Sequence, residues 1–165
     1  MDRSQEIRPG ELALAAGTIE AAPADQVVFI GRIRSPWPDR DSAPKNLRQA
    51  REREQTGSVE IDLPFRPGLD GIERYSHLVL LYWLDRSRRD LVIQKPRHAD
   101  APRGVFALRS PVRPNPIGLA VVGLLSVDVE AGVLEIDAID CIDGTPLLDI
   151  KPYLPSTDAF PDAVA

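Results

Sequence analysis

The ten residues RSPVRPNPIG, at positions 109 to 118, combine anion-binding groups with a stiff backbone. Arg109 and Arg113 supply guanidinium groups, which present planar N–H donors to a carboxylate or a phosphate. Each of the three prolines fixes its own φ and restricts the residue before it, so the loop holds one shape before any ligand binds. This preorganisation lowers the entropy lost on binding. A proline-braced corner of a β-structure is the alternative interpretation.

Basic residues are concentrated around this loop. The segment 86–113 holds eight basic and two acidic residues, a formal charge of +6, whereas the whole chain carries −5. A cationic face on an acidic body indicates a phosphate-bearing partner, although a solvated surface with ordinary ion pairs has the same composition. The eight residues, here called the basic window, are Arg86, Arg88, Arg89, Lys95, Arg97, Arg103, Arg109 and Arg113.

Carboxylates gather in a second segment, DAIDCIDGTPLLDIKPY, residues 137 to 153. Such groups can balance a cationic ligand or accept hydrogen bonds from sugar hydroxyls. Asp143 is also followed by Gly and Thr, a sequence typical of a turn, and both interpretations of this residue stay open. The four carboxylates are Asp137, Asp140, Asp143 and Asp149.

Other common site signatures are missing from the sequence. It contains no GxGxxG after a strand, no P-loop and no HExxH. His77 and His98 are the two histidines and Cys141 the one cysteine, so we predict no metal site, a structural His77 and a buried structural thiol. The chain start resembles no signal peptide, and no apolar run approaches the roughly 20 residues that span a bilayer. We therefore expect a soluble, cytoplasmic protein.

The elements that must position these residues are short. Strands are expected over residues 27–33, 58–63, 77–84, 90–94, 104–109, 119–129 and 133–141, with a further one in 143–154. In the second strand Val59, Ile61 and Leu63 are expected on one buried face, and the run HLVLLYWL is expected to be covered on both sides. The segment 46–54 predicts a short helix with Asn46 as N-cap, and residues 67–75 predict a helical turn or two.

This pattern predicts a mainly β fold, a small closed or nearly closed barrel with minor helices and no Rossmann unit. A chain of 165 residues fits one domain, which we place at 26–165. Residues 1–25 lack any period and are expected to form an N-terminal extension that need not have a fixed structure.

Three stretches together resemble one family: IGRIRSPW at 30–37, RSPVRPNPIGL at 109–119 and DGTPLLDIKPYLP at 143–155. They are similar to the YaeB or TsaA family of S-adenosylmethionine-binding proteins, also called TrmO. The resemblance runs from about Val28 to Asp162. It implies a small β-barrel that binds S-adenosylmethionine, forms a homodimer and, in characterised branches, methylates N6 of threonylcarbamoyladenosine next to the tRNA anticodon.

Matching positions in the family imply nine cofactor-binding residues here. Arg109 would bind the carboxylate of the methionyl end, Leu119 would cover the adenine, and Asp140 would hold the sulfonium or the ribose. The nine are Lys45, Asn46, Leu47, Asp85, Arg86, Arg109, Leu119, Ile139 and Asp140.

The acceptor and the catalytic base are less defined. Asp143, Lys151 and Tyr153 are candidates for taking the acceptor's proton, and the sequence selects none of them. The loop 36–57 lacks the RQPG-like element of the better known branch, and Asp85-Arg86 stands in place of a His-Gln pair. Enterobacterial members carry an additional C-terminal domain, whereas we expect the barrel alone here. A tRNA methyltransferase gripping the anticodon arm is the leading hypothesis, followed by a methyltransferase for another acceptor, such as a small molecule, and a non-catalytic binding module.

Overall fold

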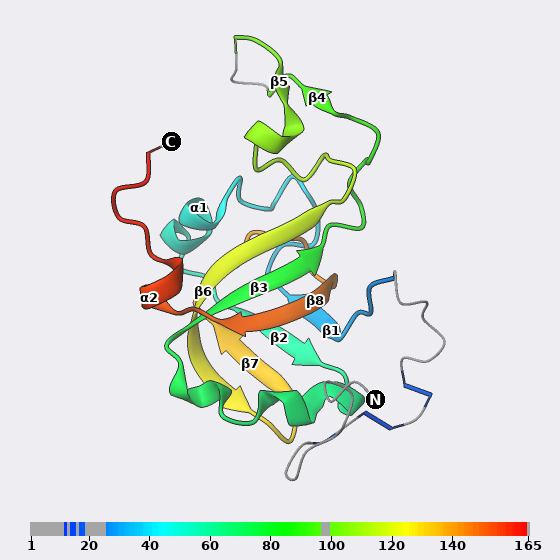
Figure 1. The fold of residues 1–165 in the computed structure, drawn as a ribbon, viewed down its shortest axis with the longest axis vertical. Helices are drawn as coiled ribbons and strands as arrows, with labels where there is room; N and C mark the ends of the chain where they lie inside the picture. The colour runs from blue at the N-terminus through cyan, green and yellow to red at the C-terminus, as the bar shows by residue number, and fades with distance from the viewer. Residues whose placement is uncertain (1–11, 13, 16, 19–25, 97–99, 165) are drawn as a thin grey trace, which may run out of the picture.

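Six antiparallel strands close into a barrel in the order β1-β2-β7-β6-β3-β8 (Figure 1). The computed structural model describes residues 12, 14–15, 17–18, 26–96 and 100–164, so the predicted N-terminal extension lies largely outside the described residues. The barrel confirms the expected fold class. Its strands are β1 (Gly31–Arg34), β2 (Gly57–Ile61), β3 (His77–Trp83), β6 (Ile117–Asp128), β7 (Val133–Ile136) and β8 (Thr145–Pro152).

A few small elements surround the barrel. The short strands β4 and β5 form a separate two-stranded sheet that stands above the barrel in Figure 1. As predicted, the Asn46 side chain caps the first helix by accepting a hydrogen bond from the Gln49 N–H. These elements are β4 (Ile93–Gln94), β5 (Arg103–Gly104), α1 (Leu47–Glu52), α2 (Pro155–Asp158) and the 3₁₀ helices η2 (Leu63–Leu69), η3 (Ile72–Arg74) and η4 (Val105–Ala107).

Strand β3 lies between β6 and β8 and pairs with both. Leu78, Leu80 and Tyr82 point into the core and are almost fully buried, while the alternate residues are half-buried on the outer side. The expected cover on both sides of this strand is therefore complete only on the inner side.

The pairing of β3 defines two ends of the barrel. Ile117, which follows the proline loop, pairs with Trp83, and the first residues of β8 lie at this same end. Gly123 pairs with His77, and Pro152 at the close of β8 pairs with Leu78. We call these the Trp83 end and the His77 end. The proline loop 109–116 thus opens at the Trp83 end.

Two of the predicted strands are only partly formed. In the remaining parts, carbonyl oxygens accept hydrogen bonds from side chains. Residues 104–109 form the short β5 and the helix η4, and Arg113 donates to the carbonyl oxygens of Val105 and Leu108. Strand β7 ends at Ile136, and beyond it Trp37 and Ser35 donate to backbone carbonyls of the segment 137–141. A neighbouring strand is not needed for these groups.

Other boundaries differ from the prediction as well, and of the strand expected over 90–94 only Ile93–Gln94, β4, is formed. The first strand begins at Gly31, and Val27 and Phe29 before it are exposed. Leu63 is 72 % exposed because the chain turns into η2 directly after β2, so it does not share the buried face of Val59 and Ile61.

Candidate functional site

A buried polar cluster lies at the Trp83 end of the barrel. Tyr82 of β3 donates its hydroxyl to Oδ1 of Asp140 at 3.2 Å, and Asp140 follows β7 in the segment that leaves the barrel wall. Gly118 of β6 lies opposite Tyr82, and any side chain at this position would collide with the tyrosine ring. The absence of a side chain at Gly118 therefore leaves the space that the Tyr82 ring needs to reach the Asp140 carboxylate.

Burial and the neighbouring polar groups shift the pKa of Asp140 in opposite directions. Burial raises the pKa of Asp140, whereas the hydrogen bond from Tyr82 and the positive charge of Arg109 act in the opposite direction. Burial, and then the charge of Asp140, also raises the pKa of the Tyr82 hydroxyl. A carboxyl group with a raised pKa gains from a bound cation, which would replace the water that it lacks. Such perturbed groups are typical of functional sites.

Arg109 is positioned beside the cluster by its own loop. Its Nη2 donates to the carbonyl oxygen of Leu119 at 3.2 Å, so the guanidinium lies against the start of β6. Leu119 is 47 % exposed and offers an apolar surface next to it. Arg113 donates inward to η4 and braces the loop, while Arg89 donates to the carbonyl oxygen of Pro114. The structure thus brings Arg109, Leu119 and Asp140 together.

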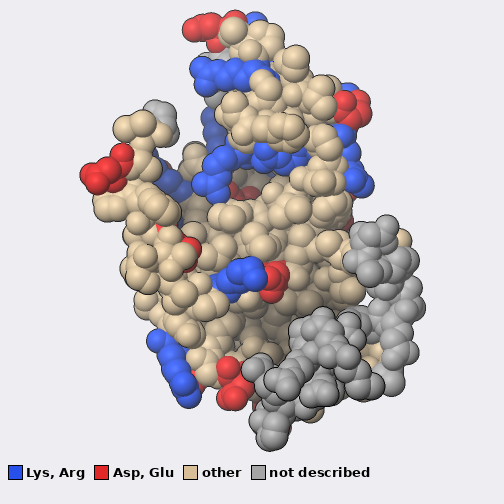
Figure 2. Space-filling view, viewed as in Figure 1, with Lys and Arg blue, Asp and Glu red and all other residues tan. Residues whose placement is uncertain are grey.

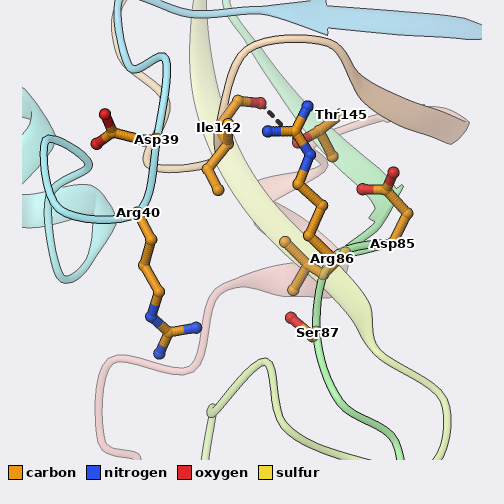
Figure 3. A pocket seen from close by; sticks show the side chains of 8 residues that line it. Asp39, Arg40, Asp85, Arg86, Ser87, Ile142 and Thr145 are labelled. Carbon is orange, nitrogen blue, oxygen red and sulfur yellow. Dashed lines mark hydrogen bonds between the residues drawn. The ribbon is translucent and has the colours of Figure 1, made fainter.

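A cavity of about 260 Å³ opens next to this cluster (Figure 3). Asp85 and Arg86, both predicted from the sequence, line it just after β3, and in Figure 3 the Thr145 hydroxyl donates to the carbonyl oxygen of Ile142 in the same lining. The cavity and the cluster adjoin because Leu84 follows Tyr82, and Ile142 follows Asp140, by two residues. The lining residues that the sequence did not indicate are Asp39, Arg40, Leu84, Ser87, Ile142 and Thr145.

The remaining predicted site residues lie apart from the cavity lining. Asn46 caps α1, the Lys45 N–H donates to Oε1 of Gln49, and Leu47 packs against the core. Ile139 is fully buried, and its carbonyl oxygen accepts a 2.7 Å hydrogen bond from the Trp37 indole. In this structure these four residues support the helix and the barrel wall behind the site.

Tyr82 is a further residue of the site that the sequence did not indicate. A tyrosine inside HLVLLYWL has the pattern of a core residue, and its ring is indeed in the core. A buried tyrosine hydroxyl usually has a hydrogen-bond partner. For Tyr82 this partner is Asp140, which makes the tyrosine part of the site.

The basic window surrounds the Trp83 end, and some of its side chains form contacts within the protein. Figure 2 shows Lys and Arg side chains gathered between the barrel and the upper sheet, over a hollow. Arg88 pairs with Asp90, and Arg89 stacks on Trp83 at 5.2 Å. Arg86, Lys95, Arg103 and Arg109 are exposed, and Arg97 lies outside the described residues. The surface is cationic, with several of its guanidinium groups also holding the loops.

Two further properties concern the described part of the chain. It contains no group of three or more His, Cys, Asp or Glu side chains that could hold a metal ion. None of the helices described there has the length and apolar character needed to cross a membrane. Cys141 is buried beside Asp140, and burial raises the pKa of its thiol to about 12, so this thiol is protonated at neutral pH.

Comparison with known proteins identifies the family of this chain. A probable S-adenosyl-L-methionine-binding protein of Archaeoglobus fulgidus is 46 % identical over 84 % of this chain and 36 % of its own length. The tRNA (adenine(37)-N6)-methyltransferase of Escherichia coli is 35 % identical over 82 % of this chain and 60 % of its own length. TrmO from Pseudomonas aeruginosa, a crystal structure, superposes with a TM-score of 0.66 at 37 % identity, covering 84 % of this chain and 60 % of that one.

The chain therefore spans between about a third and three fifths of the length of these relatives. The family model described as the tRNA-methyltransferase O N-terminal domain matches residues 32–159, most of this chain. This chain belongs to the TrmO N-terminal domain family.

Proposed function

We propose that this protein is an S-adenosylmethionine-dependent methyltransferase that modifies N6 of threonylcarbamoyladenosine next to the tRNA anticodon. Family membership and the names of the relatives support the cofactor and the tRNA adenine acceptor. The observation that carries the proposal here is the half-buried Asp140, held by Tyr82 and flanked by Arg109 at the mouth of the barrel. These groups match the charges of the cofactor.

The residues at the Trp83 end fit S-adenosylmethionine on chemical grounds. The cofactor has a carboxylate, a cationic sulfonium, ribose hydroxyls and an adenine. Arg109 would bind the carboxylate through its planar N–H groups. Asp140 would accept the ribose hydroxyls or face the sulfonium, and the raised pKa of Asp140 favours a cationic partner. The exposed Leu119 would cover the adenine, and Asp85 and Arg86 would line the remaining space.

The bound cofactor would supply an activated methyl group for attack by the acceptor nitrogen. The protein's part is mainly alignment, since methyl transfer needs no covalent enzyme intermediate. The acceptor nitrogen must also lose a proton. All three candidate bases are near other groups: the Asp143 carboxylate accepts a hydrogen bond from the Ser35 N–H and pairs with Arg34 at 3.5 Å, and Lys151 pairs with Asp149. Position separates them, since Asp143 lies just before β8 at the Trp83 end, whereas Lys151 and Tyr153 lie toward the His77 end. Asp143 is therefore the candidate base that we propose.

The exposed basic residues at this end would bind the phosphates of the anticodon arm. Arg86, Lys95 and Arg103 are exposed there, and none of them forms an ion pair within the described part of the chain. Phosphate contacts release counterions, so RNA affinity should fall steeply with salt. A tRNA substrate would place the reaction in the cytoplasm.

A homodimer is part of the same proposal. Phe106 is 85 % exposed, and Val92 and Ile93 near it are exposed as well, so the upper sheet carries apolar surface that a second copy would cover. Light scattering at micromolar concentration should give twice the monomer mass, and a monomer would contradict this part of the proposal.

The test of the proposed function is a mass measurement. The protein is incubated with S-adenosylmethionine and threonylcarbamoylated tRNA from a strain that lacks its own methylase, and the digested nucleosides are weighed. One added methyl on that nucleoside is expected, and none in a control without cofactor. Cofactor binding without this methylation would overturn the acceptor, and turnover without RNA would indicate a small-molecule acceptor.

A further inference from the structure

A second and larger groove, of about 850 Å³, lies at the His77 end of the barrel. Arg51 of α1, Arg74 of η3 and Asp137 after β7 contribute to its walls. Tyr75 after η3, His77 at the start of β3 and Tyr153 after β8 provide three rings. None of these residues takes part in the site proposed above.

The rings of this groove are open to ligands. Tyr75 is 38 % exposed, and the rings of His77 and Tyr153 lie 6.4 Å apart at an angle of 60°. Within the described part of the chain, the hydroxyls of Tyr75 and Tyr153 form no hydrogen bond, and His77 uses only Nδ1, which contacts the Ser76 hydroxyl at 3.0 Å. Exposed rings with unused polar atoms are suited to stacking and hydrogen bonding with a nucleobase.

The charges of the groove favour an anion beside the base. Arg51 and Asp137 form a 2.9 Å ion pair, and Arg51 also donates to the carbonyl oxygen of Val121, so this wall is nearly neutral. The guanidinium of Arg74 forms no ion pair or hydrogen bond within the residues that the structure describes, and this residue is exposed. It leaves one positive charge at the rim, where a phosphate group would bind.

We propose that this groove binds an unstacked nucleotide of the RNA substrate, outside the nucleotide that is methylated. The base would stack on Tyr75, Tyr153 or His77, and the adjoining phosphate would bind Arg74. This inference rests on the proposed function, because it assigns a second contact to the same substrate.

The spacing of the two regions is compatible with one RNA strand. His77 and Trp83 are six residues apart on β3, a distance of roughly 20 Å along a strand. Small barrels of the OB type accommodate about 4–16 nucleotides of single strand. The chain from Asp39 and Arg40 at the cavity to Arg51 at the groove is one continuous loop and helix, so the RNA would follow this side of the barrel.

Direct binding tests the groove separately from catalysis. Fluorescence anisotropy with a labelled anticodon-arm hairpin is measured for Arg74→Glu, Tyr153→Ala and the control Arg32→Glu, which makes the same charge change on the exposed outer side of β1. Arg74→Glu should weaken binding about tenfold and reduce the salt dependence, while Arg32→Glu should change it less than about twofold. Tyr153→Ala should weaken binding roughly 5- to 150-fold, the effect of one lost base stack.

The outcomes separate this inference from the proposed function. If Arg74→Glu, Tyr153→Ala and Arg32→Glu all bind RNA with the affinity of the wild type, the groove assignment is overturned even where methylation proceeds. If the groove variants lose affinity but the wild type does not methylate, the groove stands and the proposed reaction fails. In active protein, the groove variants should raise KM for tRNA and leave kcat unchanged. Competition by adenosine monophosphate as effective as by the hairpin would overturn the RNA assignment in favour of a free mononucleotide site.

Discussion

The two ends of β3 carry tyrosines in opposite circumstances. Tyr82 is 4 % exposed and its hydroxyl is bound to Asp140, whereas Tyr75, just before the other end, is an open ring at the rim of a groove. A polar cluster fixed before ligand binding suits alignment of a reacting group. An open aromatic surface suits contacts that tolerate many bases. The same strand thus presents a preorganised site at one end and a permissive surface at the other.

The Trp83 end accepts a cost in stability that the His77 end avoids. Burial raises the pKa of Asp140 in the folded protein, so the folded state holds this proton more tightly than the unfolded state. The contribution of this group to stability is therefore present at low pH and is lost as the pH rises through the raised pKa. A loss of stability of this kind is common where a functional site needs a buried charge.

The largest effect is expected from Arg109→Ala. Removing the guanidinium would delete the charge-assisted contact that we propose to the cofactor carboxylate, so S-adenosylmethionine affinity should fall by roughly 1.5 to 3 kcal/mol. Isothermal calorimetry measures this, with Arg103→Ala as a control from the same basic window on the exposed strand β5. Unchanged affinity in a folded Arg109→Ala protein would remove Arg109 from the cofactor site.

Gly118→Ala should destabilise the preorganised end. Its Cβ would collide with the Tyr82 ring, which has no free space in the core, and overpacking of this kind costs about 1 to 3 kcal/mol. Gly104→Ala is the matched control, because nothing lies within 4 Å of its Cβ position and its φ of −60° suits alanine. Urea unfolding compares the two, and equal stability would show that Tyr82 is free to move.

Asp140→Asn should separate stability from binding. The variant removes the buried charge, so its free energy of unfolding at neutral pH should exceed that of the wild type, and the difference should shrink toward acidic pH. Cofactor affinity should fall about tenfold, or 1.4 kcal/mol, and should lose its pH dependence. In the wild type, affinity should weaken as the pH falls, since protonation removes the charge of Asp140. Affinity that is independent of pH in the wild type would contradict this role.

The sequence correctly predicted those parts of the barrel in which backbone N–H and C=O groups form hydrogen bonds with the backbone of neighbouring strands. The alternating pattern around Leu78 and Leu80 and the long apolar run of β6 have their hydrogen bonds in neighbouring strands, and both were found. The segments 104–109 and 137–141 looked like strands as well. Their carbonyl groups are instead bound by Arg113, Trp37 and Ser35, contacts between distant or non-periodic positions that no local pattern reveals.

The proximity of the candidate site residues was predictable where they stand in a distinctive motif. Arg109 and Leu119 flank the proline loop, and the structure joins them by a hydrogen bond. Tyr82 was missed because its polar atom is hidden within an apolar pattern. The groove at the His77 end was missed because Arg74 and Tyr153 are far apart in the sequence, and only the pairing of β3 with β8 brings their segments together.

The smallest effect concerns Cys141, which reports how tightly the Trp83 end is closed. Its thiol is buried and has a pKa of about 12, so almost no thiolate exists at neutral pH. Iodoacetamide should therefore label native protein very slowly and urea-unfolded protein rapidly, with labelling followed by mass. Saturating S-adenosylmethionine should leave the slow native rate nearly unchanged, because the thiol lies behind Asp140 in the core. Rapid native labelling would mean that the segment after β7 opens readily, and the contrast between a closed end and an open end of β3 would then be lost.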